Sequence, residues 1–259
     1  MKAWKIFLGI GISVVILGVV VFLIGLGLNG WKLSVEYEMH TYRSTEDNAT
    51  LDLGLSAGEM NVVFYDGDVI EVEYPDSFRF GYDVEEKNGT LKVAPRPTFS
   101  IWFGWNRIPA VTVKIPQGKV LNLNLDLSAG TAKVASGRFG KVNASMSAGW
   151  LNFGDIKCTD FVSDTSAGKL DVSALECFTI NLDMSAGVAN VNKIVCDKIN
   201  VDLSAGSANM AVSGKKSEYS VSVDKSAGSC NLSNQTGTNG VKVIDVDLSA
   251  GSVNFVFTD

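Results

Sequence analysis

The chain is poor in the residues that most catalytic and metal sites need. It has one histidine, His40, and four cysteines, with no CxxC pair and no GxSxG motif. A nucleophilic serine needs a base within hydrogen-bond reach, and zinc sites need convergent Cys or His ligands. We therefore predict no catalytic, metal-binding or cofactor-binding residues, and we expect that the protein is not an enzyme.

Helical periodicity is also missing outside the N-terminal segment. Proline is scarce (5 residues), glycine is abundant (26), and 46% of the residues are hydrophobic while 19% are charged. This composition is typical of a folded chain rather than a disordered one. With no sustained i, i+3, i+4 pattern, the sequence predicts an all-β fold.

One long apolar run lies near the N-terminus. Residues 6–28 carry no charge, and their number matches the roughly 20 apolar residues with which a helix crosses a bilayer. Lys2 and Lys5 precede the run, and Glu36 and Glu38 follow it. The positive-inside rule then predicts a single-pass anchor in the cell membrane, with a cytoplasmic N-terminus and an extracytoplasmic C-terminal domain. A cleaved signal peptide is the alternative.

The triplet Ser-Ala-Gly recurs through the rest of the chain. Its serines are Ser56, Ser128, Ser147, Ser166, Ser185, Ser204, Ser226 and Ser249, and four successive intervals are 19 residues long. Apolar residues recur at a spacing of two within each unit, which is typical of strands. The repeat predicts a parallel β-solenoid (β-helix) with 19-residue coils, three short strand segments to a coil, stacked about 4.8 Å apart.

Each triplet is interpreted as a corner of a coil. Glycine suits a corner where φ is positive or where a side chain would meet the next coil, and we expect the alanine to face inward and the serine outward. The cysteines follow the same period, since Cys158, Cys177 and Cys196 are 19 residues apart and Cys230 comes later. We interpret the first three as a column of small buried apolar side chains.

Two polar columns are expected on the outside. Position 6 of the repeat, counted from the serine, is mostly asparagine, and stacked amides can hydrogen bond along such a column; its asparagines are Asn61, Asn152, Asn190, Asn209, Asn231 and Asn254. Position 18 is aspartate in six units and serine at Ser145; the aspartates are Asp126, Asp164, Asp183, Asp202, Asp224 and Asp247. Two interpretations stay open: these carboxylates accept hydrogen bonds from corner amides, or they form an acidic stripe that binds cations or a cationic peptide.

The 72 residues between the first two triplets do not repeat. Alternating strands flank Asp66-Gly67 and again Asn88-Gly89, so we predict two hairpins and an antiparallel cap on the N-terminal end of the solenoid. Residues 98–109, TFSIWFGWNRIP, form a candidate binding loop or, alternatively, a hydrophobic plug. Its candidate residues are Phe99, Trp102, Phe103, Trp105 and Arg107. At the other end, SVNFVFTD follows the last triplet with no polar cap, which favours association with a partner or a second copy.

These features together resemble a bacterial family of "putative adhesin" domains. The resemblance rests on the N-terminal anchor, the D-G-D strand pair, N-G-T-L-K-V, the aromatic loop, V-T-V-K-I-P-Q-G-K and the iterated L-S-A-G coils, and it covers residues 33–259. It implies a membrane-anchored β-helical domain of the kind found in Lia-type cell-envelope stress operons. It implies no catalytic residues.

The sequence therefore predicts three parts and a non-catalytic role. Residues 1–32 are the cytoplasmic stub and anchor, 33–127 the N-terminal β region with the first coil and the aromatic loop, and 128–259 the repeat solenoid. Beyond residue 32 the chain has 19 basic and 28 acidic residues, a net charge of −9, because 1–32 contain three of the 22 basic residues and no acidic one. This charge disfavours nucleic acid and favours cationic partners. We expect a binding or sensing module of the bacterial cell envelope, in envelope stress or adhesion; the alternatives are a self-assembling surface element and a glycan-active β-helix enzyme.

Overall fold

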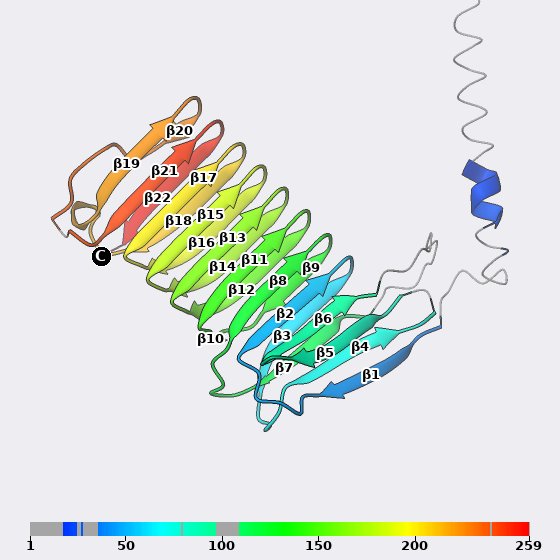
Figure 1. Ribbon diagram of the computed structural model, residues 1–259. Helices are drawn as coiled ribbons and strands as arrows, with labels where there is room; N and C mark the ends of the chain where they lie inside the picture. The colour runs from blue at the N-terminus through cyan, green and yellow to red at the C-terminus, as the bar shows by residue number, and fades with distance from the viewer. Residues whose placement is uncertain are drawn as a thin grey trace, which may run out of the picture.

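The computed structural model describes residues 18–24, 27, 36–78, 80–96, 109–238 and 240–258. Apart from the helical residues 18–24 and 27 and one short 3-10 helix, η1 (Lys216–Glu218), its regular structure is all β (Figure 1). The strands form a 12-stranded sheet, here sheet A, and a 10-stranded sheet, here sheet B. Within the described ranges no helix is long and apolar enough to cross a membrane. Residues 6–17, 25, 26 and 28 of the predicted anchor lie outside those ranges.

Each 19-residue unit forms one coil of a parallel β-solenoid. In the unit around Ser166, β13 (Asp160–Thr165) lies in sheet B, the Ser-Ala-Gly corner follows, β14 (Lys169–Glu176) lies in sheet A, and a second corner leads to β15 (Thr179–Met184) in sheet B. Pairing partners in successive coils are 19 residues apart, as in Asp160↔Thr179 and Lys169↔Val188. The predicted solenoid and its period are confirmed. The prediction of three strands per coil is wrong for the coils that begin at Ser147, Ser166 and Ser185, since their two sheet A segments form one long strand; the coil that begins at Ser128 has three strands.

The other coils repeat this arrangement. Sheet B contains β2 (Thr50–Leu55), β6 (Thr90–Pro95), β8 (Asn122–Leu127), β11 (Lys141–Met146), β17 (Lys198–Leu203), β19 (Ser220–Lys225) and β21 (Val243–Leu248). Sheet A contains β3 (Glu59–Tyr65), β7 (Val111–Pro116), β9 (Thr131–Val134), β10 (Gly137–Arg138), β12 (Trp150–Lys157), β16 (Val188–Val195), β18 (Ser207–Ser213), β20 (Ser229–Cys230) and β22 (Ser252–Thr258).

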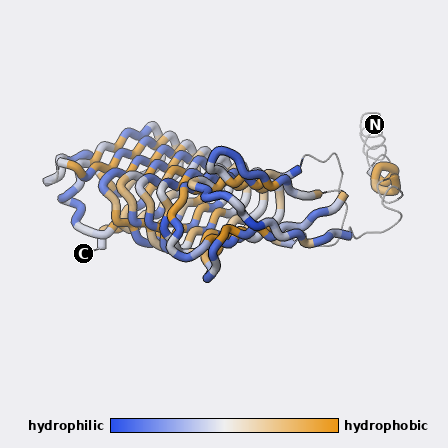
Figure 2. The backbone as a smooth tube through the Cα atoms, turned by 60° about the horizontal axis from the view of Figure 1, so that its bottom comes forward, coloured by the Kyte–Doolittle hydropathy of each residue, from blue (hydrophilic) through white to orange (hydrophobic). Residues whose placement is uncertain are grey.

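The core lies between the two sheets and consists of stacked apolar columns. Leu51, Leu123, Val142, Phe161 and Ile180 are fully buried rungs of one such column. Burial alternates along the strands, as the polar and apolar residues of the tube in Figure 2 do. Burial of apolar surface stabilises by about 25 cal/mol per Å², so the period of two in the sequence fixes which face of each strand points inward.

The glycine of each corner is required by both backbone conformation and space. Gly187 has φ +126°, and a Cβ there would lie 2.1 Å from the carbonyl oxygen of Gly168 in the preceding coil. The predicted reasons for glycine are therefore confirmed. The prediction for the alanine is wrong, because Ala148, Ala167 and Ala186 are exposed rather than directed into the core. The corner turns the chain through three outward residues in a row.

The N-terminal end carries the predicted antiparallel cap, but with one unexpected pairing. β5 (Tyr82–Lys87) and β6 form the predicted hairpin, and Asn88 and Gly89 both have positive φ, as the two-residue turn requires. The hairpin predicted around Asp66-Gly67 does not form. β7 lies between β3 and β4 (Glu71–Asp76), parallel to the former and antiparallel to the latter. β1 (Glu38–Arg43) then pairs with β4 as the outermost strand of sheet A.

At the C-terminal end, the last two coils stack in the reverse of their order in the sequence. The last coil of the sequence, β21 and β22, inserts against β17 and β18, while the preceding coil, β19 and β20, lies outside it. The outer edge of β19 is covered in turn: Val221 and Gln235 exchange backbone hydrogen bonds, and the Asn234 side chain accepts one from the Val223 amide. The uncapped final coil predicted from the sequence is therefore wrong, because that coil is an inner layer.

The asparagine and cysteine columns form as stacks. Asn209 donates a 3.0 Å hydrogen bond to Asn190, which donates one of 2.9 Å to Asp171. Asn231 leaves its column, since its amide hydrogen-bonds both backbone groups of Phe255 beside the short strand β20. The four cysteines are free thiols; Cys196 is buried, while Cys158 and Cys177 are half-buried at the second corner. The predicted cysteine column is present, with an opening toward solvent.

Candidate functional site

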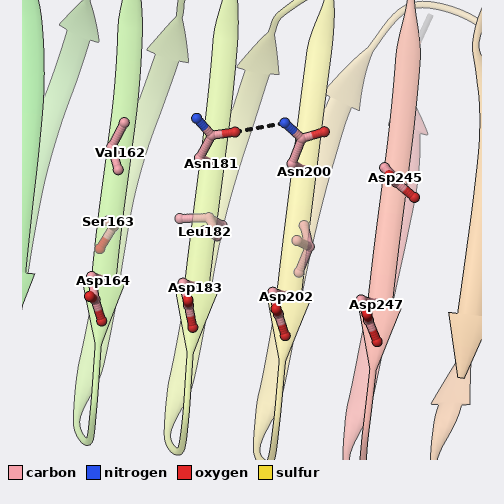
Figure 3. Close-up of a pocket in the computed structure, with 11 residues that line it drawn as sticks. Val162, Ser163, Asp164, Asn181, Leu182, Asp183, Asn200, Asp202, Asp245 and Asp247 are labelled. Atoms are coloured by element: carbon pink, nitrogen blue, oxygen red, sulfur yellow. Dashed lines mark hydrogen bonds between the residues drawn. The ribbon is translucent and has the colours of Figure 1, made fainter. Parts of the chain in front are cut away.

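The predicted acidic stripe forms a continuous row on the outer face of sheet B (Figure 3). Asp164, Asp183, Asp202, Asp247 and Asp224 are direct partners on five adjacent parallel strands. Figure 3 shows the first four of them. We call these five residues the aspartate ladder. Neighbouring parallel strands lie about 4.8 Å apart, so the carboxylates are spaced at that interval along the solenoid. The order in space differs from the order in sequence, because β21 lies between β17 and β19.

Asp126 stands apart from the ladder. Its partners on the two neighbouring strands are Gly54 and Ser145, and Ser145 separates it from Asp164. The predicted stripe of six therefore consists of five consecutive aspartates and one separated by a single coil.

The ladder carboxylates are exposed and make no ion pair with another described residue. The interpretation that they accept hydrogen bonds from the Ser-Ala-Gly amides is wrong. Those amides bond to the preceding corner instead: Ser147 N donates to Leu127 O at 2.9 Å and Ala148 N to Ser128 O at 3.1 Å. Because the corner satisfies its own amides from coil to coil, the carboxylates are left for solvent or a ligand.

Burial and neighbouring charges change the titration of Asp183 in the ladder. Partial burial, together with the charges of Asp202 and Asp164 on either side, raises the pKa of Asp183 above its ordinary value. Repulsion between unit charges about 4 Å apart costs about 1 kcal/mol in water, and a bound cation would remove it. The arrangement therefore favours association with positive charge.

We predict that Asp183→Asn stabilises the protein at neutral pH by up to about 1 kcal/mol. The raised pKa means that the folded state holds the proton more tightly than the unfolded state, whose pKa is near the ordinary 3.8. The penalty is therefore absent below that pKa and develops as the pH rises through the raised value. Urea denaturation at pH 3 and pH 7 measures this difference. Asp126→Asn, which has no charged neighbour in its column, is the control and should change little; equal gains at both pH values would contradict the prediction.

A second polar column borders the ladder. Asn181, Asn200 and Asp245 lie two residues before Asp183, Asp202 and Asp247 on the same strands, and Asn200 donates a 2.6 Å hydrogen bond to Asn181. The two columns line a shallow groove of about 350 Å³ on the outer face of sheet B, as Figure 3 shows. The groove thus offers four ladder carboxylates along one side and amides, with a fifth carboxylate from Asp245, along the other.

Sequence reasoning missed this second column. The signal was present, because residues two apart on a strand share a face, so the residues two before each ladder aspartate had to lie beside it. No three His, Cys, Asp or Glu side chains among the described residues are arranged to hold a metal ion. A row of carboxylates at strand spacing suits an extended cationic chain with several positive groups better than a single coordinated ion.

The candidate aromatic loop cannot be compared with the ladder. Phe99, Trp102, Phe103, Trp105 and Arg107 lie outside the described residues. The loop connects β6 in sheet B to β7 in sheet A, which is the connection that Ser-Ala-Gly corners make in the repeat coils. Its role as a binding loop or a plug stays a prediction.

Comparison with known proteins agrees with the architecture. The model of the Toastrack DUF4097 family matches residues 51–257. The crystal structure of a "putative adhesin" from Bacteroides fragilis is similar with a TM-score of 0.54 and 11% identity, over 87% of this chain and 99% of that one. That of a "putative adhesin" from Parabacteroides merdae has a TM-score of 0.43 and 10% identity, over 85% of this chain and 96% of that one. No curated protein matches. At such low identity the Bacteroides structure shows the fold alone.

Proposed function

Since the chain belongs to the Toastrack DUF4097 family, we propose that it is a non-catalytic binding module whose aspartate ladder binds cationic ligands at the bacterial cell envelope. The observation that carries the proposal is the row of five adjacent, exposed aspartates without ion-pair partners among the described residues. Elsewhere on the surface acidic residues are often neutralised, as Glu176 is by Lys157 and Glu59 by Lys133. The ladder has no such neutralisation among the described residues, although its five carboxylates lie on adjacent strands.

The ligand class follows from spacing and charge. The ladder extends along the solenoid axis with a carboxylate at about every 4.8 Å, so a ligand gains most by placing several positive groups along the same line. A lysine-rich peptide, including a cationic antimicrobial peptide, meets this requirement, whereas nucleic acid and anionic lipid surfaces are repelled. The ectodomain net charge of −9 adds a long-range attraction for cations.

The membrane anchor is part of the proposal. Its support is the run of 23 uncharged residues at positions 6–28 and the lysines that precede it. The solenoid would then stand outside the cytoplasm, where envelope-directed cationic peptides first meet the cell. A role in sensing or buffering envelope stress is the proposed biological setting, with adhesion as the other.

The self-assembly alternative loses its main support. It depended on a bare edge after the last triplet, and that coil lies inside the stack, beneath β19 and β20. Among the described residues of the ladder, no observation specifically favours a glycan-active enzyme. The binding module therefore stands as the proposed function.

A salt-dependent titration tests the proposal. The full chain in a neutral detergent is titrated with a lysine-rich peptide at about 0.05 M and about 0.5 M salt. The Debye length is longer than about 10 Å at the lower salt concentration and shorter at the higher one. The expected result is saturable binding at low salt that weakens steeply at high salt. A glutamate-rich peptide of the same length is the control. Absence of binding at low salt, or equal binding of the acidic peptide, would contradict the proposal.

A further inference from the structure

The three stacked cysteines lie at the second corner of successive coils, on the side of each coil opposite the Ser-Ala-Gly turn. The Sγ atoms of Cys177 and Cys196 are 3.6 Å apart, and Cys158 occupies the same place one coil earlier. The corner backbones are in register, since Cys158 N donates to Glu176 O and Cys177 N to Val195 O, both at 3.0 Å. The repeat therefore holds two thiols side by side with no intervening group.

The geometry of this pair meets the requirements of a disulfide. Disulfides join residues whose Cα atoms are about 4.4–6.8 Å apart, and adjacent parallel strands place in-register residues about 4.8 Å apart. Bond formation requires the two sulfurs to approach from 3.6 Å to about 2.0 Å, which rotation of the two side chains can supply. Both residues follow the ends of their sheet A strands, where the backbone is less constrained than inside the sheet.

Solvent and small molecules can reach the pair. Cys158, Cys177 and Cys196 line a shallow groove of about 410 Å³, together with Phe139 and Phe178. Cys177 is half-buried, whereas Cys196 is 4% exposed and lies 3.2 Å from the Phe178 carbonyl oxygen and 3.1 Å from that of Lys198. Cys196 is therefore held in place by the backbone, and Cys177 is the more exposed of the two thiols.

The two thiols are also electrostatically unequal. Hydrogen bonds with Cys158 and Cys196, together with burial, raise the pKa of Cys177. The hydrogen bond donated by Cys177 lowers the pKa of Cys196. Disulfide exchange requires both access and a thiolate. The more exposed Cys177 therefore reacts first with an external disulfide, and Cys196, whose pKa this contact lowers, is the thiolate that attacks second.

We propose that Cys177 and Cys196 are a modification site at which a low-molecular-weight disulfide introduces a cross-link between two coils. The Cys177 thiolate attacks one sulfur of the disulfide RS–SR, forms a mixed disulfide and releases RS⁻. The Cys196 thiolate then attacks the Cys177 sulfur, the second RS⁻ leaves, and each RS⁻ takes up a proton. In sum, two cysteine thiols are oxidised to one disulfide and RS–SR is reduced to two RSH.

This site is separate from the aspartate ladder and does not depend on its function. The ladder lies on the outer face of sheet B beside the Ser-Ala-Gly corners, whereas the thiols lie at the opposite corner. A cross-link there would join the coil of β14 covalently to the coil of β16, which are otherwise held together by non-covalent contacts such as backbone hydrogen bonds and the hydrogen bond from Asn190 to Asp171.

Peptide mapping tests the proposal on the unmodified full chain. The protein is incubated with glutathione disulfide, remaining thiols are blocked, and the chain is digested with trypsin. Cleavage after Lys169, Lys193 and Lys198 separates Cys177 on peptide 170–193 from Cys196 on peptide 194–198. The expected result is that these two peptides are joined, with a mass lower than their sum by two hydrogen atoms, and that this linkage dominates over all others.

Variants then separate the two chemical steps. In Cys196→Ser the cross-link is lost and Cys177 stops at a glutathione adduct, whereas Cys230→Ser retains the cross-link, because Cys230 is in the outermost coil on β20. Circular dichroism verifies that each variant is folded. The proposal is overturned if the wild-type chain yields only glutathione adducts, if its main linkage involves Cys158 or Cys230, or if the thiols remain unmodified.

Discussion

Replacing Gly187 by alanine is expected to destabilise the solenoid by more than about 3 kcal/mol, the largest effect predicted for a single methyl group in this chain. Gly187 has φ +126°, which L side chains rarely adopt. Its Cβ would also lie 2.1 Å from the Gly168 carbonyl oxygen and 3.0 Å from the Gly168 nitrogen. Those are backbone atoms of the coil below, so no side-chain rotation relieves the contact, and the two coils must separate. Urea denaturation of the two proteins measures the loss.

Gly118→Ala is the matched control for this substitution. Gly118 also has positive φ, +83°, but a Cβ there meets nothing within 4 Å. It therefore reports the conformational cost alone, which is about 1 kcal/mol for a single residue in the left-handed region. The difference between the two variants measures the contact between corners. Equal losses would show that the corners can separate freely and would contradict the close stacking of coils.

The triple variant Asp164→Asn, Asp183→Asn, Asp202→Asn is expected to bind a lysine-rich peptide about tenfold more weakly or worse at low salt. Each exposed ion pair contributes up to about 1 kcal/mol, and three adjacent carboxylates are lost. The same change relieves repulsion within the ladder, so the variant should be at least as stable as the wild type. Weaker binding without loss of stability is a combination that misfolding cannot produce. Isothermal titration and urea denaturation measure the two quantities.

A charge-matched variant controls for the overall field. Asp66→Asn, Asp68→Asn, Glu85→Gln removes three exposed acidic residues from the N-terminal region, far from the ladder in sequence and in the strand order of the sheets. It changes the net charge by the same amount and should retain most of the binding. Equal weakening in both variants would mean that net charge alone, and not the ladder, attracts the peptide.

The coils could be predicted from sequence because they are local. A single period carries the strand alternation, the corner glycine and the stacking register, and Asp183 and Asp202 were placed on one outer face for that reason. The Asn88-Gly89 hairpin was likewise predictable, since a two-residue turn determines the pairing of its flanking strands. Each of these features is determined by residues that lie within about one coil length of each other in the sequence.

The ends of the solenoid could not be predicted because more than one strand of the chain could pair with the same sheet edge. β3 and β4 look like a hairpin around Asp66-Gly67, yet β7 occupies the position between them. At the other end β21 and β22 lie inside β19 and β20. All coils present similar apolar faces and similar backbone edges, so the repeat pattern does not encode their order. The exchange covers the final coil and places Asp247 between Asp202 and Asp224.

The exposed alanine of the corner shows a different limit. Alternation predicts that Ala167 points inward, since Thr165, two residues before it, is buried. A turn that uses a glycine with positive φ breaks the alternation, so the residues of the triplet all lie outside the core. Periodicity holds along strands and fails at the residues that reverse the chain direction. The ladder aspartates are the second-to-last residues of their strands, so the strand alternation still determines the face on which they lie.

Zero-length cross-linking tests the central claim most directly, because it identifies the carboxylates that contact the ligand. The full chain is mixed with a lysine-rich peptide at low salt, treated with a carbodiimide that joins touching carboxylates and amines, and mapped by mass spectrometry. The prediction is that the peptide is attached mainly to Asp164, Asp183, Asp202, Asp247 or Asp224, and that high salt abolishes the attachment. Attachment spread evenly over exposed acidic residues such as Asp66, Asp68 and Glu85, or absent from the ladder, would contradict it.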